Sequence, residues 1–261
     1  MTPLGVRNPG RPVVSGEPLV GVVFDFDGVI ADTEGLHLQA YQDVLRAHGM
    51  TLSRDDYEAR YLGFDDVGVF TTVAAHRGLT LARGELDRMI EAKGRRFAAL
   101  VDAGGVVFAD APACIERLAG GLVLGIASGA LHQEIEDILN GAGLRRHFSA
   151  IVAADDVERA KPAPDGYARA VELLSARLGR PPSPAGFIAI EDSRWGIEAA
   201  VAAGLPCIGV TTTYPAGELS GATAIVAGLA DIDRRALAAL HQGAGPARVD
   251  VRTPRVHNGV Q

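Results

Sequence analysis

Cysteine is scarce in this chain of 261 residues. Cys114 and Cys207 are the only two, and their spacing fits neither a metal site nor a disulfide framework. Both stand among apolar residues, so we expect them to be packed in the interior.

Basic stripes and long apolar runs are also missing. The formal net charge is -7 and the pI about 5.5, which disfavours a nucleic-acid binder. Nothing approaches the roughly 18 consecutive apolar residues that would span a membrane. The first residues, MTPLGVRNPGRPVVSGEPL, lack the apolar centre of a signal peptide and resemble a loose arm. We therefore expect a cytoplasmic protein that binds neither nucleic acid nor membrane.

Short Val-rich apolar runs are what the sequence does contain. The run over 19–24 is typical of a strand buried on both faces, as in a parallel sheet. Helical patterns separate most of the runs, which predicts an α/β fold with a doubly wound, mostly parallel sheet and a Rossmann-like core. The further runs cover residues 122–127, 150–153, 187–190, 207–210 and 224–226.

One long stretch breaks this alternation. Residues 35–105 show helical spacing and no convincing strand, and they are far more than the roughly a dozen residues that a crossover needs. We expect a small all-helical domain inserted into a core that is formed by 19–34 and 106–242. The remaining segments, 1–18 and 243–261, are predicted to be disordered.

Polar and charged residues follow the first four predicted strands. Because ligands bind beyond the carboxyl ends of parallel strands, these side chains are expected to share one crevice. They are Asp25 and Asp27, Ser128 and Gly129, Lys161, and Glu191 and Asp192.

The carboxylates of this set would repel one another and raise one another's pKa values. A hard cation such as Mg²⁺ resolves this, because carboxylate oxygens suit it, and it also offsets the charge of a phosphate group. Lys161 adds a point charge on the phosphate and can hold the nucleophile in position, while Ser128 can contact phosphate oxygens.

The spacing of Asp25 and Asp27 gives them different roles. Residues i and i+2 of an extended strand end point the same way, so both can face the substrate. Attack by the Asp25 carboxylate forms an aspartyl-phosphate, and Asp27 serves as general acid and base, which contributes roughly 10²–10⁴-fold. Gly28 lets the chain turn close to the ligand.

Four ordered motifs resemble those of the haloacid dehalogenase superfamily of phosphohydrolases, over residues from about 20 to 230. They are Asp25-Phe26-Asp27-Gly28, Ala127-Ser128-Gly129, Lys161-Pro162 and Ile190-Glu191-Asp192-Ser193. The resemblance implies Mg²⁺ held by Asp25, the backbone carbonyl of Asp27, Glu191 and Asp192. It implies that Ser128, Gly129 and Lys161 bind the phosphate of a small phosphorylated metabolite.

The inserted helical segment is similar to the cap of the subgroup that contains β-phosphoglucomutase and phosphoglycolate phosphatase. Thr33 and His37 match positions of the mutase, but its cap-loop Arg is missing here. The corresponding loop offers Gly63, Asp65 and Asp66 instead, and its acidity would repel a second phosphate.

We therefore rank a phosphatase of small monoesters, such as sugar phosphates or phosphoglycolate, above a hexose-phosphate mutase. Arg60 or Lys93 could still supply the missing positive charge. A catalytically silent binding module ranks last. His37, Gly63 and Asp66 are the cap residues predicted to bind substrate, with Asp65 as a helix cap in the alternative interpretation. The expected state is a monomer or a weak dimer.

Overall fold

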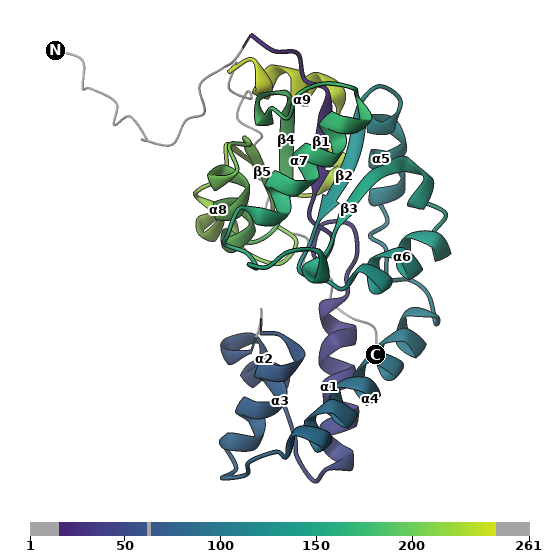
Figure 1. Cartoon of the computed structure of the whole chain (residues 1–261), viewed down its shortest axis with the longest axis vertical. Helices are drawn as coiled ribbons and strands as arrows, with labels where there is room; N and C mark the ends of the chain where they lie inside the picture. Colours follow the sequence, from purple (N-terminus) through teal and green to yellow (C-terminus); the bar gives the residue numbers. More distant parts are fainter. Residues whose placement is uncertain (1–15, 62–63, 244–261) are drawn as a thin grey trace, which may run out of the picture. The chain divides into compact units, whose positions relative to one another are not determined.

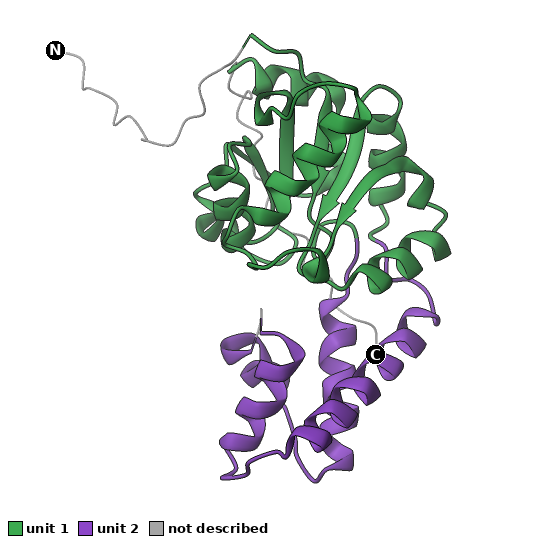
Figure 2. Ribbon diagram, in the orientation of Figure 1, with its two compact units in different colours: residues 1–30, 108–261 green, residues 31–107 purple. Residues whose placement is uncertain are grey.

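The computed structural model describes residues 16–61 and 64–243. It divides into two compact units, shown in different colours in Figure 2. The described residues of 1–30 and 108–261 form the core unit, and those of 31–107 form the cap unit. The segments expected to be disordered, 1–18 and 243–261, lie almost wholly outside the described residues.

Six parallel strands form the sheet of the core unit, in the order β3-β2-β1-β4-β5-β6. Figure 1 labels β1 to β5. The predicted parallel α/β fold is confirmed. The third strand begins at Phe148, two residues earlier than the apolar run indicated, because the exposed Ser149 interrupts that run. The strands are β1 (Gly21–Phe24), β2 (Val123–Ala127), β3 (Phe148–Val152), β4 (Phe187–Glu191), β5 (Cys207–Val210) and β6 (Ala224–Val226).

Helices cover the strands so well that every residue of β1 and β4 is buried. Their apolar faces meet a core that contains Tyr167, Leu174 and Ile197. The helices of this unit are α5 (Ala111–Ala119), α6 (His132–Gly141), α7 (Asp165–Arg177), α8 (Arg194–Ala202) and α9 (Arg234–His241). Short 3-10 turns complete it: η1 (Arg145–His147), η2 (Ala154–Asp156), η3 (Pro184–Gly186), η4 (Ala216–Leu219) and η5 (Leu229–Asp231).

Ser193 and Asp110, which precede helices α8 and α5, form different hydrogen bonds. Ser193 caps α8, since its side chain accepts a hydrogen bond from the Gly196 N–H at 3.1 Å. Asp110 precedes α5 but does not cap it. Its carboxylate accepts instead from the Ala230 N–H at 2.9 Å, and it therefore ties α5 to η5.

The sheet reverses its chain order at β1, which lies between β2 and β4. Phe24, the last residue of β1, is in register with Ile126 of β2 and Ile190 of β4. The residues that follow these three strands therefore emerge side by side. In a parallel α/β sheet this switch point is where a ligand binds.

The cap unit contains α1 (Glu34–Ala47), α2 (Arg54–Arg60), α3 (Asp66–Ala75) and α4 (Arg83–Val101). Asp65 caps α3, because its carboxylate accepts from the Gly68 N–H at 2.7 Å. The segments at the two ends of the unit pair through an antiparallel bridge between Ala31 and Val107. No helix in the described part of the chain is long and apolar enough to cross a bilayer.

Candidate active site

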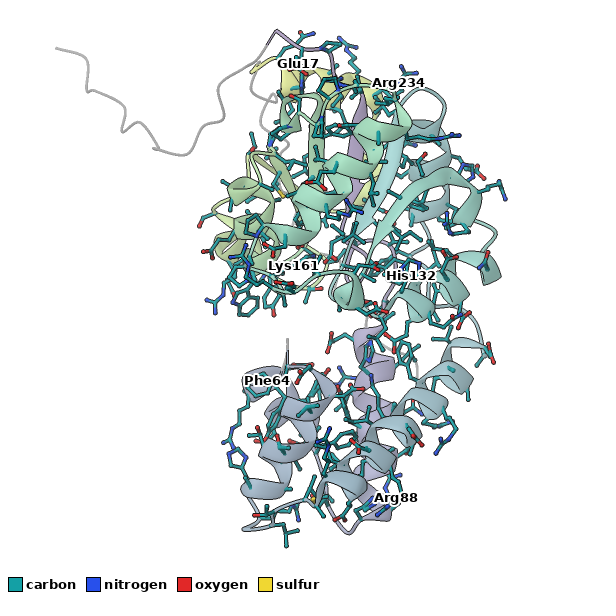
Figure 3. All side chains as sticks on the ribbon, viewed as in Figure 1. Glu17, Phe64, Arg88, His132, Lys161 and Arg234 are labelled. Carbon is teal, nitrogen blue, oxygen red and sulfur yellow. The ribbon has the colours of Figure 1, made fainter. Side chains whose placement is uncertain are left out.

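Lys161 lies between two carboxylates at the ends of β1 and β4. Its Nζ is 2.7 Å from Oδ1 of Asp25 and 2.6 Å from Oε1 of Glu191. Figure 3 labels Lys161 among the side chains of the core unit. The Asp25 N–H also donates to the Ile190 carbonyl at 2.8 Å, which fixes its backbone beside β4. The contact with Lys161 is an ion pair whose geometry leaves the buried Asp25 Oδ1 without a hydrogen bond.

Glu191 is fully buried and is held on all sides. Its Oε2 accepts from the Asp192 N–H, the Ser193 N–H and the Ser193 hydroxyl, each at 3.0 Å. Its Oε1 accepts from Lys161 and, at 3.1 Å, from the Tyr167 hydroxyl. These five bonds use the lone pairs of the carboxylate, so Glu191 acts first as the anchor of Lys161 and of the turn into α8.

The loops after β1 and β4 approach each other closely. Gly28 has a φ of +75°, and a Cβ at this position would lie 1.9 Å from Oδ2 of Asp192. Only glycine fits there, because of both the backbone conformation and the neighbouring carboxylate. Thr213, after β5, hydrogen-bonds the same Asp192 carboxylate, and the Thr212 hydroxyl donates to the Gly28 carbonyl.

Three hydroxyl-bearing residues of this site escaped the sequence analysis: Tyr167, Thr212 and Thr213. The two threonines follow a predicted strand, so the rule about strand ends could have found them. Tyr167 had no comparable signal, since its position on the inner face of a helix indicates packing.

Ser128 and Gly129 follow β2 at the same edge of the sheet. The Ser128 side chain is buried, and its Oγ accepts from the Ala130 N–H at 3.1 Å. Gly129 is exposed, and a Cβ there would meet no atom within 4 Å. Asp27 is half-buried, and its charge raises the pKa values of both Asp25 and Asp192.

The electrostatics of the cluster show an excess of negative charge. Burial, then the Glu191 carboxylate, raises the pKa of Asp25 well above its ordinary value. The same two causes raise the pKa of Asp192 to about 7. Burial alone would lower the pKa of Lys161, but the Asp25 and Glu191 carboxylates outweigh it and raise that pKa.

A cation fits this environment. Oxygen atoms of Asp25, Glu191 and Asp192 lie within 4.8 Å of one another, and one ammonium group cannot neutralise all three. Clustered carboxylate oxygens are the donor type that Mg²⁺ prefers.

Two of the cap residues that were predicted to bind substrate, His37 and Asp66, have partners inside the cap unit. Asp66 forms an ion pair with Lys93 at 3.0 Å and accepts from the Tyr41 hydroxyl at 2.5 Å. The His37 ring stacks on Phe97, with centroids 4.1 Å apart. Gly63 lies outside the described residues. The substrate-binding role of these three residues stays a prediction.

This fold and site define an α/β enzyme with a buried acidic centre at the switch point of its sheet. The family model of the haloacid dehalogenase-like hydrolases matches residues 22–210. The chain belongs to this family.

Relatives support the same placement. The chain is 33% identical to Protein CbbY of Rhodobacter capsulatus over 77% of its own length and 88% of that protein. It is 30% identical to the validoxylamine A 7'-phosphate phosphatase of Streptomyces hygroscopicus subsp. limoneus (80% and 94% covered). It is also 30% identical to the fructose-1-phosphate phosphatase YqaB of Escherichia coli (74% and 97%).

Solved structures share the fold. A β-phosphoglucomutase of Clostridium difficile superposes with a TM-score of 0.72 at 20% identity, covering 86% of this chain and 98% of that one. CbbY of Rhodobacter sphaeroides in complex with phosphate gives a TM-score of 0.69 at 27% identity, with 82% and 96% covered.

Proposed function

We propose that this protein is a Mg²⁺-dependent phosphatase of small phosphate monoesters, such as sugar phosphates or phosphoglycolate, and that it works through an aspartyl-phosphate on Asp25. The predicted enzyme class, a phosphoric monoester hydrolase, is confirmed by the family and by the named phosphatases among its relatives. The contact of Lys161 with both Asp25 and Glu191 is the observation that carries the mechanism.

The reaction begins at Asp25. Its carboxylate oxygen attacks the phosphorus, and the bond from phosphorus to the ester oxygen breaks. Asp27 gives its proton to the leaving oxygen. Asp27 then takes a proton from water, which attacks the phosphorus and releases inorganic phosphate from Asp25.

The other residues of the site hold these groups in place. Lys161 favours the charged form of Asp25, and its ammonium group also binds the phosphate. The Ser128 hydroxyl and the loop at Gly129 bind the phosphate as well. Asp25, Asp192 and the backbone carbonyl of Asp27 would hold Mg²⁺, with Glu191 beside them. When bound, Mg²⁺ neutralises charge on the phosphate and reduces its repulsion by Asp25.

The interior of the cap unit favours hydrolysis over the mutase reaction. A mutase must hold the second phosphate of a bisphosphate, and Lys93 was one candidate for that charge. Lys93 is only 3% exposed, and its charge is neutralised by Asp66. Arg60, the other candidate, lies 3.7 Å from Asp56 on an exposed surface. We therefore rank the mutase second.

A substrate panel tests the proposal. Fructose 1-phosphate, phosphoglycolate and β-glucose 1-phosphate are incubated with Mg²⁺ or with a chelator, and released phosphate is measured. We expect release that the chelator abolishes and that Asp25→Asn lowers by at least about 10³-fold. Isomerisation of β-glucose 1-phosphate primed by a bisphosphate would favour the mutase instead.

The covalent step has its own readout. Wild-type protein quenched in acid during turnover of a ³²P-labelled substrate should carry label, and Asp25→Asn should carry none. Asp137→Asn, a change of an exposed carboxylate on α6, is the matched control and should retain both label and activity. Label that persists in Asp25→Asn would contradict the assignment of the nucleophile.

A cytoplasmic location is part of the proposal. Both cysteines are buried free thiols, the form that reducing compartments preserve.

A further inference from the structure

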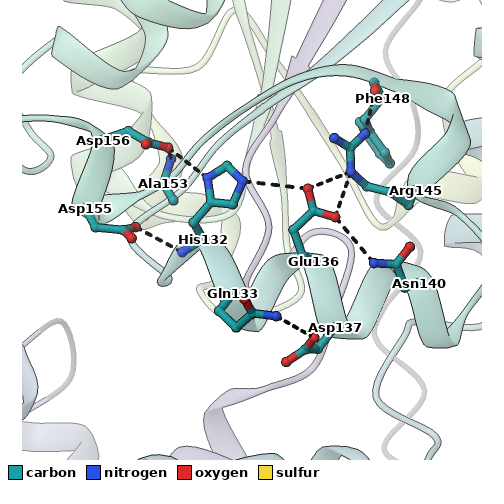
Figure 4. Close-up of polar contacts among 10 residues, drawn as sticks. All are labelled: His132, Gln133, Glu136, Asp137, Asn140, Arg145, Phe148, Ala153, Asp155 and Asp156. Atoms are coloured by element: carbon teal, nitrogen blue, oxygen red, sulfur yellow. Dashed lines mark hydrogen bonds and ion pairs between the residues drawn. The ribbon is translucent and has the colours of Figure 1, made fainter.

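Outside the acidic centre, His132 stands at the junction of two loops. It is the first residue of α6 and follows the loop 128–131, which carries Ser128 and Gly129. Figure 4 shows its imidazole between carboxylates from two different elements. Nδ1 lies 3.0 Å from Oδ2 of Asp156, and Nε2 lies 3.6 Å from Oε1 of Glu136.

We propose that His132 is a positioning residue, which in its protonated form fastens the phosphate-binding loop 128–131 to the turn after β3. This inference rests on the proposed function, because phosphate binding by the loop 128–131 is part of that function.

Two backbone hydrogen bonds already join the loop to the turn. The Ser128 N–H donates to the Val152 carbonyl at 2.9 Å, and the Ala154 N–H donates to the Ala130 carbonyl at 2.9 Å. Neither bond depends on pH. They bring the two segments into contact, but they do not fix the start of α6, which is held by side chains.

His132 supplies that second attachment, through its backbone and its ring. Its N–H donates to Oδ1 of Asp155 at 3.0 Å, while its ring contacts Asp156. Asp156 is itself fixed, since the same Oδ2 accepts from the Ala153 N–H at 2.9 Å. The imidazole therefore connects α6 to a rigid turn.

The charge of the ring decides how many contacts it makes. A neutral imidazole can donate its one N–H to Asp156 but has no charge with which to attract Glu136, whereas the imidazolium donates to Asp156 and forms an ion pair with Glu136 at 3.6 Å. Charge-assisted bonds are also stronger than neutral ones. Protonation therefore tightens the attachment, and deprotonation loosens it.

The charged groups around His132 come from four elements. Asp155 and Asp156 face it from η2, and Glu136 from its own helix. Arg145 of η1 holds Glu136 through Nε at 2.7 Å, and Arg169 of α7 acts on Asp156.

The balance of these charges is acidic. The hydrogen bond that the His132 ring donates to Asp156 is the largest cause that raises the pKa of His132, with smaller contributions from the charges of the acidic groups around it. A raised pKa means that the attachment is complete below the ordinary value of about 6.5 and is lost as pH rises through the value in the folded protein.

Direct phosphate binding tests the proposal without any need for turnover. The dissociation constant of inorganic phosphate is measured calorimetrically with Mg²⁺ between pH 5.5 and 9, for wild type and His132→Gln. The ratio of the two constants cancels the titration of phosphate itself. We expect binding to be about two- to fivefold weaker in the variant at pH 5.5, the range that exposed ion pairs give, and the ratio to fall to one at high pH.

Two further variants complete the experiment. Asp156→Asn removes the carboxylate but keeps an acceptor for the Ala153 N–H, and it should reproduce the pH-dependent ratio. His48→Gln removes an exposed imidazole at the end of α1 and should follow wild type. Proton NMR of His132 should show titration above pH 6.5 in wild type and at lower pH in Asp156→Asn.

The outcomes separate this inference from the proposed function. A ratio that stays constant with pH, or that equals one throughout, overturns the positioning role of His132. A protein that hydrolyses no phosphate ester but shows the pH-dependent ratio contradicts the proposed function and supports this inference.

Discussion

Nζ of Lys93 lies 3.0 Å from Oδ1 of Asp66 in the interior of the cap unit. Lys93 is 3% exposed and also lies over the rings of Tyr41 and Phe97, 5.1 and 5.3 Å from their centroids. A buried ammonium group needs such a partner, because its desolvation is otherwise uncompensated. The pair therefore binds α3 to α4.

Breaking this pair should destabilise the protein strongly. Lys93→Met leaves the Asp66 carboxylate without its cation, and we expect the free energy of unfolding to fall by about 2–4 kcal/mol in urea titrations. The double variant Lys93→Met/Asp66→Asn should recover most of the loss, since asparagine still accepts from Tyr41. Arg46→Met breaks an exposed pair with Asp43 and should cost at most about 1 kcal/mol. Equal losses of unfolding free energy in Lys93→Met and Arg46→Met would contradict the stabilising role of the buried pair.

Gly196 is the second position where a small change should have a large effect. A Cβ there would lie 1.6 Å from Oε1 of Glu191. Glu191 cannot move aside without losing some of the five hydrogen bonds that hold it, one of which comes from Lys161. Gly196→Ala should therefore displace Lys161 and lower phosphatase activity by at least about tenfold.

Gly141, near the end of α6, is the matched control for Gly196. A Cβ there would meet no atom within 4 Å. Gly141→Ala should stabilise the protein by up to about 1 kcal/mol, as helix propensity predicts, and leave activity unchanged. Activity that survives in Gly196→Ala, with normal unfolding, would show that Glu191 is not a rigid anchor.

The strand ends of the site were predictable because a parallel sheet places all its carboxyl ends at one edge. Buried Val-rich runs located those strands to within about two residues, so Asp25, Lys161 and Glu191 could be grouped from the sequence. The motifs that resemble those of the family predicted which of these residues bind the metal and which bind the phosphate. The roles of the individual residues are still proposals.

The partners of charged residues in the cap were not predictable. Lys93 and Asp66 stand on different helices, 27 residues apart, and no local pattern indicates that they meet. Asp65 and Asp66 are adjacent and identical in type, yet one caps a helix and the other pairs with a lysine. Tertiary packing decides between these uses, and sequence spacing does not report it.

The stability of the protein should respond to the titration of His37. Burial, then the charge of Lys93, lowers the pKa of His37 to about 3. The folded protein therefore keeps this ring neutral, while the unfolded chain protonates it below about pH 6.5. Stability is lost as pH falls from about 6.5 towards 3.

Urea titrations of wild type and His37→Gln between pH 7.5 and 4 measure this contribution. The stability of wild type relative to the variant should decrease as pH falls, because glutamine does not titrate. Proton NMR should show no protonation of His37 above pH 5. A midpoint near pH 6.5 would contradict the packing of the ring on Phe97.

The Tyr167 hydroxyl should matter for catalysis although it lies behind the reacting groups. It donates to Oε1 of Glu191, the atom that also receives Lys161. Tyr167→Phe keeps the ring under Lys161 and removes one bond to a buried charge, so unfolding should become easier by about 1–3 kcal/mol. We expect kcat/KM to fall about 10–100-fold, the effect typical of partners that orient a site. Tyr57→Phe removes a buried hydroxyl in the cap unit and should lower stability with little change in kcat/KM. If Tyr167→Phe lowers the free energy of unfolding but leaves kcat/KM unchanged, then Lys161 holds its position without the tyrosine hydroxyl. The hydrogen bond would then stabilise the fold only.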